Sequence, residues 1–161
     1  MATHTATIEW TSNGSKFTDN RYSRAHRWSF DGGAVVPASS SPHVVRVPLS
    51  DPAGVDPEEA YVAALSSCHM LWFLSIAAQE GYVVTAYRDE AEGTMATNDA
   101  GKEFVGRVLL KPSVTFGGTK VPTGEVLRHL HHEAHEACFL ANSVKTVIDV
   151  AGNWTHAAAV D

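Results

Sequence analysis

The chain has 161 residues, 44% of them hydrophobic, which suits one compact domain with an apolar core. Eighteen acidic and twelve basic residues give a net charge of −6, and Lys and Arg form no run. This balance argues against nucleic acid or an anionic membrane as a partner, and we expect a single domain over residues 1–161.

Only two cysteines occur, Cys68 and Cys138. The first ten residues are polar and show no secretory pattern, so we expect a cytoplasmic protein in a reducing compartment. A structural disulfide is then not expected, but a transient catalytic one is permitted. The alternative is that both thiols are small apolar residues of the core, and the number of cysteines alone favours this alternative.

The first third of the chain predicts short strands separated by turns. Alternation over residues 3–11 indicates a first strand, and a second spans residues 24–30 before Asp-Gly-Gly at 31–33. Residues 38–42 and 51–55 are predicted loops, with a third short strand at 44–47.

A long helix is predicted from Asp56 to about Glu80. Asp56 is a favourable N-cap, Pro57 suits the first turn, Glu59 completes a capping box, and Gly81 ends the helix. The helix is apolar on nearly every side and must be covered all round, for which a partner subunit is the natural cover. Serines and acidic flanks argue against a membrane span, so we expect a buried helix.

The remainder alternates between strands and one further helix. Strands are predicted at 83–87, 90–96 and 104–116, with a turn at 98–101. A helix at 123–142 carries apolar residues at helical spacing, and strands at 144–150 and 154–157 follow. This element order predicts an α+β fold.

Both cysteines should face the interior, where two packed helices can bring their Cα atoms within disulfide range. A thiol in an apolar helix needs a nearby cation to become a reactive thiolate. Arginines before and within the second strand are candidates, although a solvated charge is the favoured explanation for any one of them: Arg21, Arg24 and Arg27.

Glu58 has two interpretations. Either its carboxylate is simply stabilised by the positive end of the helix dipole, or it takes part in the chemistry. Ten residues, or roughly 15 Å of helix, separate it from Cys68. Glu58 is therefore better placed for a shared arginine or a partner chain's thiol than for the thiol of its own chain.

Four histidines on the second predicted helix suggest a metal site as an alternative to the cysteine chemistry: His129, His131, His132 and His135. His131 and His135 are four residues apart, as helical metal ligands can be. The tract only loosely resembles the His-Glu-x-x-His zinc motif and lies off the stripe of Leu127, Leu130 and Cys138. A solvated face is therefore favoured over a metal site, and no metal or cofactor is expected.

Two long motifs resemble the signatures of the OsmC/Ohr family, which comprises osmotically inducible protein C and organic hydroperoxide resistance proteins. Residues 56–69 read Asp-Pro-Glu-Glu-Ala-Tyr-Val-Ala-Ala-Leu-Ser-Ser-Cys-His, and residues 134–143 read Ala-His-Glu-Ala-Cys-Phe-Leu-Ala-Asn-Ser. The element order fits too, so the resemblance covers nearly the whole chain. The second motif has Phe139 where family members often have Pro, and residues 22–42 also differ from the best-known members.

The resemblance implies an OsmC-like α+β fold, with antiparallel sheets around a long central helix, in an intertwined homodimer with active sites at the interface. It implies a thiol-dependent peroxidase that reduces organic hydroperoxides to alcohols, an antioxidant oxidoreductase. Cys68 matches the peroxidatic cysteine, Cys138 the resolving cysteine, and Glu58 the glutamate that holds the catalytic arginine. Arg24 is our choice for that arginine, with Arg21 as the alternative.

The implied cycle passes through a Cys68 sulfenic acid and a disulfide with Cys138. An external dithiol reduces this disulfide, and the resemblance suggests a lipoylated protein as that reductant. Apolar neighbours Trp72, Phe73 and Phe139 are expected to favour organic over hydrogen peroxide. Two alternatives remain, namely a non-enzymatic dimeric protein that binds a small ligand, and a histidine metal-site hydrolase.

Overall fold

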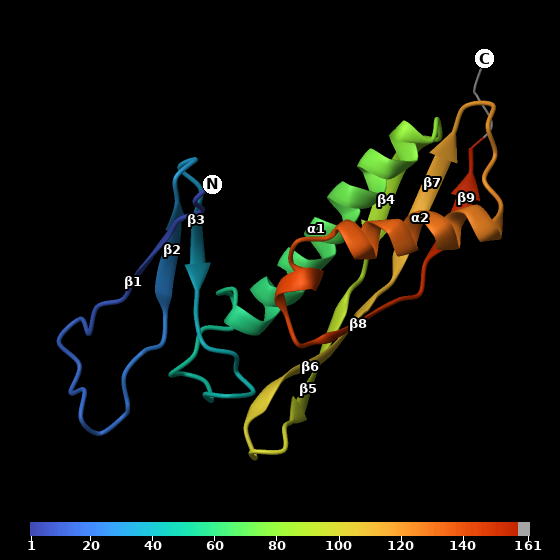
Figure 1. Ribbon diagram of the computed structural model, residues 1–161. Helices are drawn as coiled ribbons and strands as arrows, with labels where there is room; N and C mark the ends of the chain where they lie inside the picture. Colours follow the sequence, from blue (N-terminus) through green and yellow to red (C-terminus); the bar gives the residue numbers. More distant parts are fainter. Residues whose placement is uncertain (158–161) are drawn as a thin grey trace. The chain divides into compact units, whose positions relative to one another are not determined.

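The computed structural model describes residues 1–157 of the chain (Figure 1). Contacts between residues divide the chain into two compact units, Met1–Ala60 and Tyr61–Asp161. The single domain expected from chain length therefore stays a prediction. The fold is a mixed α+β arrangement with antiparallel strand pairs and a long apolar helix, as the resemblance implied.

The first unit is built on an antiparallel sheet of three short strands, ordered β1 (Ala6–Glu9), β2 (His26–Phe30) and β3 (Val35–Ala38). The hairpin between β2 and β3 turns through Gly33, whose φ of 85° favours glycine. The strand predicted at residues 44–47 is wrong. This segment forms turns in which the Ser41 carbonyl accepts from the amides of Val44 and Val45, and Val44 is 72% exposed.

Helix α1 spans Pro57–Gln79, and the predicted capping box is confirmed. The Glu59 amide donates to Asp56 Oδ1 across 2.8 Å, and Glu59 Oε2 accepts from the Asp56 amide at 3.2 Å. The helix ends as expected before Gly81, which has a φ of 77°. Residues close in sequence thus define both ends of the helix, through a side-chain cap at its start and a glycine at its end.

The second unit contains two three-stranded sheets, ordered β4-β7-β9 and β5-β6-β8. The C-terminal strands pair in parallel with their neighbours, and the other pairs are antiparallel. The strands are β4 (Val83–Asp89), β5 (Glu92–Thr97), β6 (Glu103–Leu110), β7 (Pro112–Gly117), β8 (Val147–Val150) and β9 (Asn153–His156).

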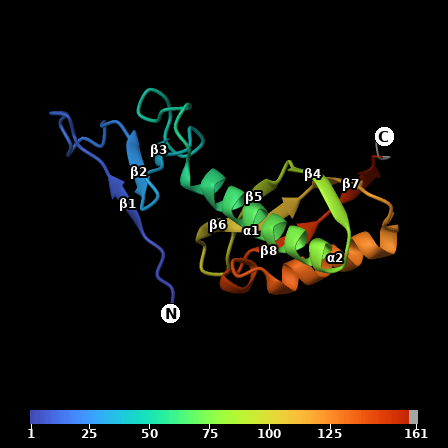
Figure 2. The same cartoon turned by 90° about the horizontal axis from the view of Figure 1, so that it is seen from above.

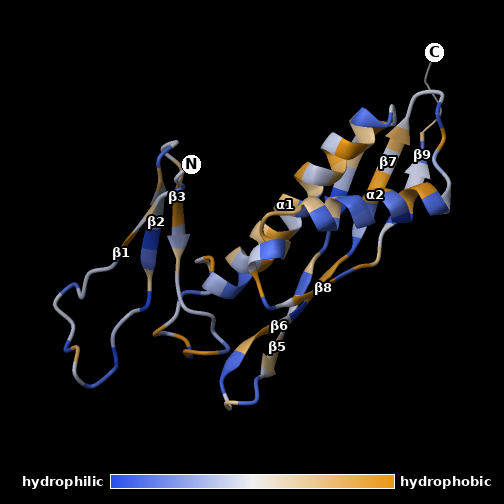
Figure 3. Cartoon of the chain, in the orientation of Figure 1, coloured by the Kyte–Doolittle hydropathy of each residue, from blue (hydrophilic) through white to orange (hydrophobic). Residues whose placement is uncertain are grey.

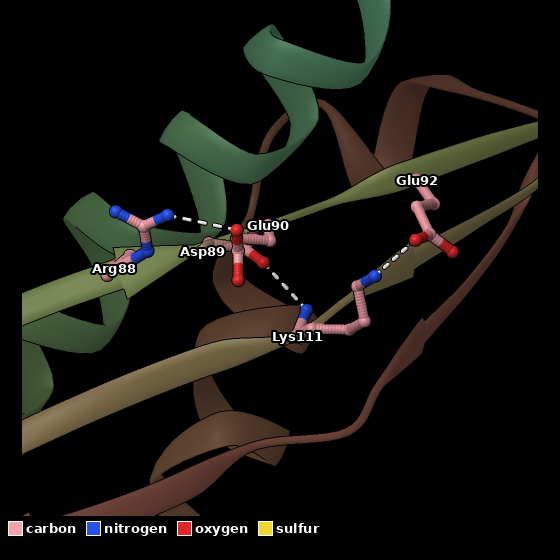
Figure 4. Close-up of polar contacts among 5 residues, drawn as sticks. All are labelled: Arg88, Asp89, Glu90, Glu92 and Lys111. Carbon is pink, nitrogen blue, oxygen red and sulfur yellow. Dashed lines mark hydrogen bonds and ion pairs between the residues drawn. The ribbon is translucent and has the colours of Figure 1, made fainter.

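The strand predicted at 104–116 is divided at Lys111, between β6 and β7. There the Asp89 carboxylate accepts from the Lys111 amide at 2.6 Å and from Ser66 Oγ on α1 at 2.5 Å. Figure 4 shows Asp89 beside Lys111, whose ammonium group pairs with Glu92. One carboxylate therefore connects the break in the strands to the middle of α1.

Helix α2 (Gly124–Ala137) is capped by Thr123, whose Oγ1 accepts from the Val126 amide at 3.2 Å. It ends five residues earlier than predicted, and a short 3₁₀ turn, η1 (Ala141–Ser143), follows. The two helices cross in Figures 1 and 2, and the hydropathy colouring of Figure 3 shows α1 as the more apolar of the two.

Two apolar clusters form the core of the second unit. The larger joins α1, α2 and β7 through Phe73, Phe116 and Leu130, and the smaller joins Leu65 of α1 to β6. Side chains spaced four residues apart on α1 supply its buried face: Leu65, His69, Phe73 and Ala77. The core therefore fixes the rotation of α1 about its axis, and with it the direction of Cys68.

By length and hydropathy alone, α1 is able to cross a membrane. Core helices of soluble proteins have the same properties, and 22% of the most apolar 18-residue window of α1 is buried within this chain. Leu71, one of its large apolar side chains, is exposed. Much of the apolar surface of α1 thus remains available to another molecule.

Candidate functional site

The two cysteines lie in direct contact within the second unit. Cys68 is half-buried near the middle of α1, and Cys138 is buried immediately after the last residue of α2. Both are free, and the Cys138 thiol donates a hydrogen bond to Cys68 Sγ across 2.7 Å. A small movement is enough to bring the sulfurs within bonding distance.

Cys138 lies at the C-cap of α2 in an extended conformation, with φ −68° and ψ 114°, not inside a helix as predicted. Its sulfur accepts from the Ala141 amide at 3.4 Å, while side-chain amide hydrogens of Asn142 cap the Glu136 and Cys138 carbonyls. The polar side chains after α2 thus replace further helical hydrogen bonds and hold the turn that carries the second cysteine.

Burial, and then the hydrogen bond with Cys68, raise the pKa of the Cys138 thiol, although the Ala141 and Leu140 amides oppose this shift. Cys138 therefore keeps its proton near neutral pH and acts as the donor of the pair. The Cys68 sulfur is the acceptor and is the less buried of the two. This polarity suits Cys68 as attacking group and Cys138 as the second thiol.

An aromatic pair lies beside the sulfurs. Trp72, one turn beyond Cys68, packs edge-to-face on Phe139, with ring centroids 5.4 Å apart. Phe139 directly follows Cys138 and is 71% exposed. The expectation that Phe73 belongs to this group is wrong, because Phe73 is fully buried in the core.

A buried histidine pair lies on the core side of the helices. His69 Nε2 and His131 Nδ1 are 3.0 Å apart, and Phe73 stacks on the His131 ring. Burial is the main cause that lowers the pKa of His69 to about 4 and of His131 to about 3, so both rings are neutral at physiological pH. The prediction that His131 lies on a solvated face is therefore wrong.

His131 Nε2 is buried without a hydrogen-bond partner among the described residues. Such a group typically costs about 1–3 kcal/mol. A Cβ at Gly152 would lie 2.5 Å from this nitrogen, so only glycine fits against it. Of the other histidines on α2, His129 is exposed and pairs with Glu80 at 3.0 Å. Within residues 1–157, no three His, Cys, Asp or Glu side chains are arranged to hold a metal ion.

The first unit holds Arg24 and Glu58 in the lining of one cavity of about 530 Å³. The Arg24 guanidinium lies 3.7 Å from the Tyr22 ring centre and donates to Asn20 Oδ1 at 2.8 Å. Among the described residues Arg24 and Glu58 form no ion pair, so the clamp implied by the resemblance is absent from the single chain. Arg21 is exposed and does not line the cavity.

Three aromatic rings that sequence patterns did not single out complete this cavity. Phe17 and Tyr22 stack with centroids 4.6 Å apart, and Trp10 packs against both rings. The Trp10 indole donates to the Ser23 carbonyl at 2.8 Å. The three residues lie in and beside a turn-rich loop, where no periodicity marks them as neighbours.

The model of the OsmC-like protein family matches residues 50–151. An OsmC-like protein of unknown function from Vibrio cholerae is 55% identical and has a TM-score of 0.92, with 95% of this chain and 100% of that chain covered. No curated protein matches this chain.

Two organic hydroperoxide resistance proteins share the fold at low identity. That of Elizabethkingia anophelis is 14% identical, with a TM-score of 0.65 over 98% of both chains. That of Bacillus subtilis is 15% identical, with a TM-score of 0.60 over 96% of this chain and 98% of the other.

Proposed function

The chain belongs to the OsmC-like protein family, and we propose that it is a cysteine-based peroxidase that reduces organic hydroperoxides to alcohols. The observation that carries this proposal is the contact between the two thiols, 2.7 Å apart, with Cys138 as the donor and Cys68 as the acceptor. This is the arrangement that a two-cysteine redox cycle requires before each turnover.

In the proposed cycle, the Cys68 thiolate attacks the outer oxygen of the hydroperoxide, and the O–O bond breaks. Cys68 becomes a sulfenic acid, and the alkoxide takes a proton and leaves as the alcohol. The Cys138 sulfur then attacks the sulfenic sulfur, which forms a disulfide and releases water. An external dithiol reduces this disulfide by exchange and is itself oxidised, and a lipoylated protein is one candidate.

We assign the activation of Cys68 to Arg24, with Glu58 as the residue that orients the guanidinium. Both line one cavity in the first unit, whereas Arg21 does not. In the single chain, Arg24 donates to Asn20 and not to Glu58. The clamp therefore requires a rearrangement, for which dimer formation is our proposed cause.

A homodimer is part of the proposal because α1 leaves apolar surface uncovered within one chain. Roughly 15 Å of helix separates Glu58 from its own Cys68. In the proposed dimer, the Arg24 and Glu58 of one subunit serve the Cys68 of the other. The cytoplasmic location stays a prediction.

The Trp72–Phe139 pair gives the proposed preference for organic substrates. A hydrophobic group on the peroxide gains free energy by leaving water against these rings, whereas hydrogen peroxide has no such group. The expected preference is for a bulky substrate such as cumene hydroperoxide.

A non-enzymatic binding protein of the same fold is the second candidate. The aromatic cavity of the first unit favours it, because three rings and one guanidinium suit a small organic ligand without any redox step. Peroxidase turnover decides between the two.

The test is consumption of cumene hydroperoxide with an excess of a dithiol. We expect Cys68→Ser to abolish turnover. We expect Cys138→Ser to reduce one equivalent of peroxide and then to accumulate an oxidised Cys68, visible as added oxygen in the intact mass. Equal, full activity in both variants excludes the two-cysteine cycle.

Mixed dimers test which subunit supplies Glu58. One subunit carries Cys68→Ser and the other Glu58→Gln, so the only intact Cys68 has a wild-type Glu58 only if the partner supplies it. We expect about half of wild-type activity in this dimer. The matched control places both substitutions in one subunit beside a wild-type partner, and it should be impaired. The reverse pattern assigns Glu58 to its own chain.

A further inference from the structure

A second cavity, of about 730 Å³, lies in the second unit between α2 and the C-terminal strands β8 and β9, and neither cysteine lines it. We call it the α2 cavity. Its α2 side carries Leu127, Arg128, His131, His132 and His135, and the opposite side includes Ile148, Val150 and Trp154. The proposed peroxidase chemistry does not use any of these residues.

The ionisable groups that line the α2 cavity are all basic, and Asn153 adds one neutral polar side chain. Arg128, His132 and His135 lie on successive turns of α2, and no carboxylate lines the cavity within the described part of the chain. Arg128 has no ion-pair partner among residues 1–157. A fixed positive charge beside two imidazoles attracts an anion.

A buried donor adds an independent observation. His131, 6% exposed, lines the cavity, and its Nε2 has no partner among the described residues. His69 Nε2 lies 3.0 Å from His131 Nδ1. When His69 donates across this contact, His131 keeps its proton on Nε2, which is then a buried donor without a partner among the described residues. Gly152, also in the lining, packs directly against this nitrogen.

Apart from Asn153, the other side chains of the lining are apolar. Leu127 of α2 faces Ile148 and Val150 of β8 across the cavity, and Trp154 of β9 adds a broad aromatic surface. A small inorganic anion would leave these side chains without contacts. A ligand with an apolar body gains by covering them, and the volume accommodates a bicyclic ring system.

We propose that the α2 cavity is a binding site for an amphipathic monoanion, with a carboxylate held by Arg128 and an aromatic or short alkyl body against Ile148, Val150 and Trp154. This site is separate from the thiol pair. Binding there requires neither cysteine and is independent of the proposed peroxidase function.

The probe is 2-naphthoate, and its matched neutral control is 2-naphthamide, which has the same ring system without the charge. Isothermal titration calorimetry should show that the full-length protein binds naphthoate at least tenfold more tightly than naphthamide. Arg128→Gln should weaken naphthoate binding at least tenfold. Arg107→Gln is the control, because Arg107 pairs with Asp149 at 2.6 Å and does not line the cavity.

Two further measurements locate the site. Amide resonance shifts on titration should concentrate in residues 127–135 and 148–154. Cys68→Ser should bind naphthoate as tightly as the wild type, and Arg128→Gln should keep wild-type peroxide turnover. The proposal is overturned if naphthoate does not bind at millimolar concentration, if Arg128→Gln binds it as tightly as the wild type, or if the amide binds as well as the acid.

Discussion

The buried histidine pair predicts a steep loss of stability in mild acid. His69 and His131 are neutral in the folded chain, with pKa values of about 4 and about 3, against 6.5 when exposed. Between pH 6.5 and pH 4 the unfolded chain therefore binds more protons than the folded chain. The free energy of unfolding must fall as the pH falls through this range and is independent of the pair above it.

The size of the effect follows from these values. At pH 5 each exposed imidazole gains about 2 kcal/mol from protonation, while the buried rings gain almost nothing. The pair should thus lower the free energy of unfolding by about 4 kcal/mol between pH 8 and pH 5. Asp89 raises the pKa of His69 and His135 lowers it, and each of these two shifts is smaller than the shift caused by burial.

Urea unfolding at pH 8 and pH 5, followed by circular dichroism at one protein concentration, measures this difference. The double substitution His69→Gln and His131→Gln removes both titrating rings and should reduce the pH-dependent loss by about 4 kcal/mol, whatever its effect at pH 8. The exposed His132→Gln is the control and should leave the loss unchanged. A double variant that loses as much stability in acid as the wild type refutes the reasoning.

Three further predictions follow from local contacts. Asp56→Ala removes the N-cap acceptor and should lower the free energy of unfolding by about 1 kcal/mol in urea; an unchanged midpoint contradicts the cap. Gly152→Ala forces a methyl group against a buried imidazole and should cost about 1–3 kcal/mol by the same measurement, whereas a neutral effect means that the loop yields freely. Arg24→Ala should slow alkylation of Cys68 by iodoacetamide at pH 7 about tenfold, and Arg21→Ala should not; equal rates remove Arg24 from the site.

Features set by neighbouring residues could be predicted from the sequence. The start of α1 rests on Asp56 and Glu59, and its end on Gly81, and all three behave as their local chemistry indicates. The contact between Cys68 and Cys138 was predicted from helical spacing, but Cys138 reaches Cys68 from the C-cap of α2 and not from within the helix.

Features set by distant contacts could not be predicted in this way. The division of the strand at Lys111 involves Asp89, which is 22 residues away. The early end of α2 is a local feature that the apolar spacing did not indicate, since Asn142 caps carbonyls only four and six residues before it. His131 is a different case. It lies at helical spacing from Leu127 and Ala134, so the apolar stripe itself includes it, and grouping residues by type obscured its burial.

The position of Cys138 just outside α2 has a consequence for the backbone. A residue inside a helix has helical hydrogen bonds on both sides, whereas Cys138 at the C-cap has only one bond to α2, from its amide to the His135 carbonyl. Cys138 can therefore rotate toward or away from Cys68 while α2 retains every hydrogen bond up to Ala137. Amide hydrogen exchange along α2 should be the same in reduced and oxidised protein, with changes confined to residues 138–143.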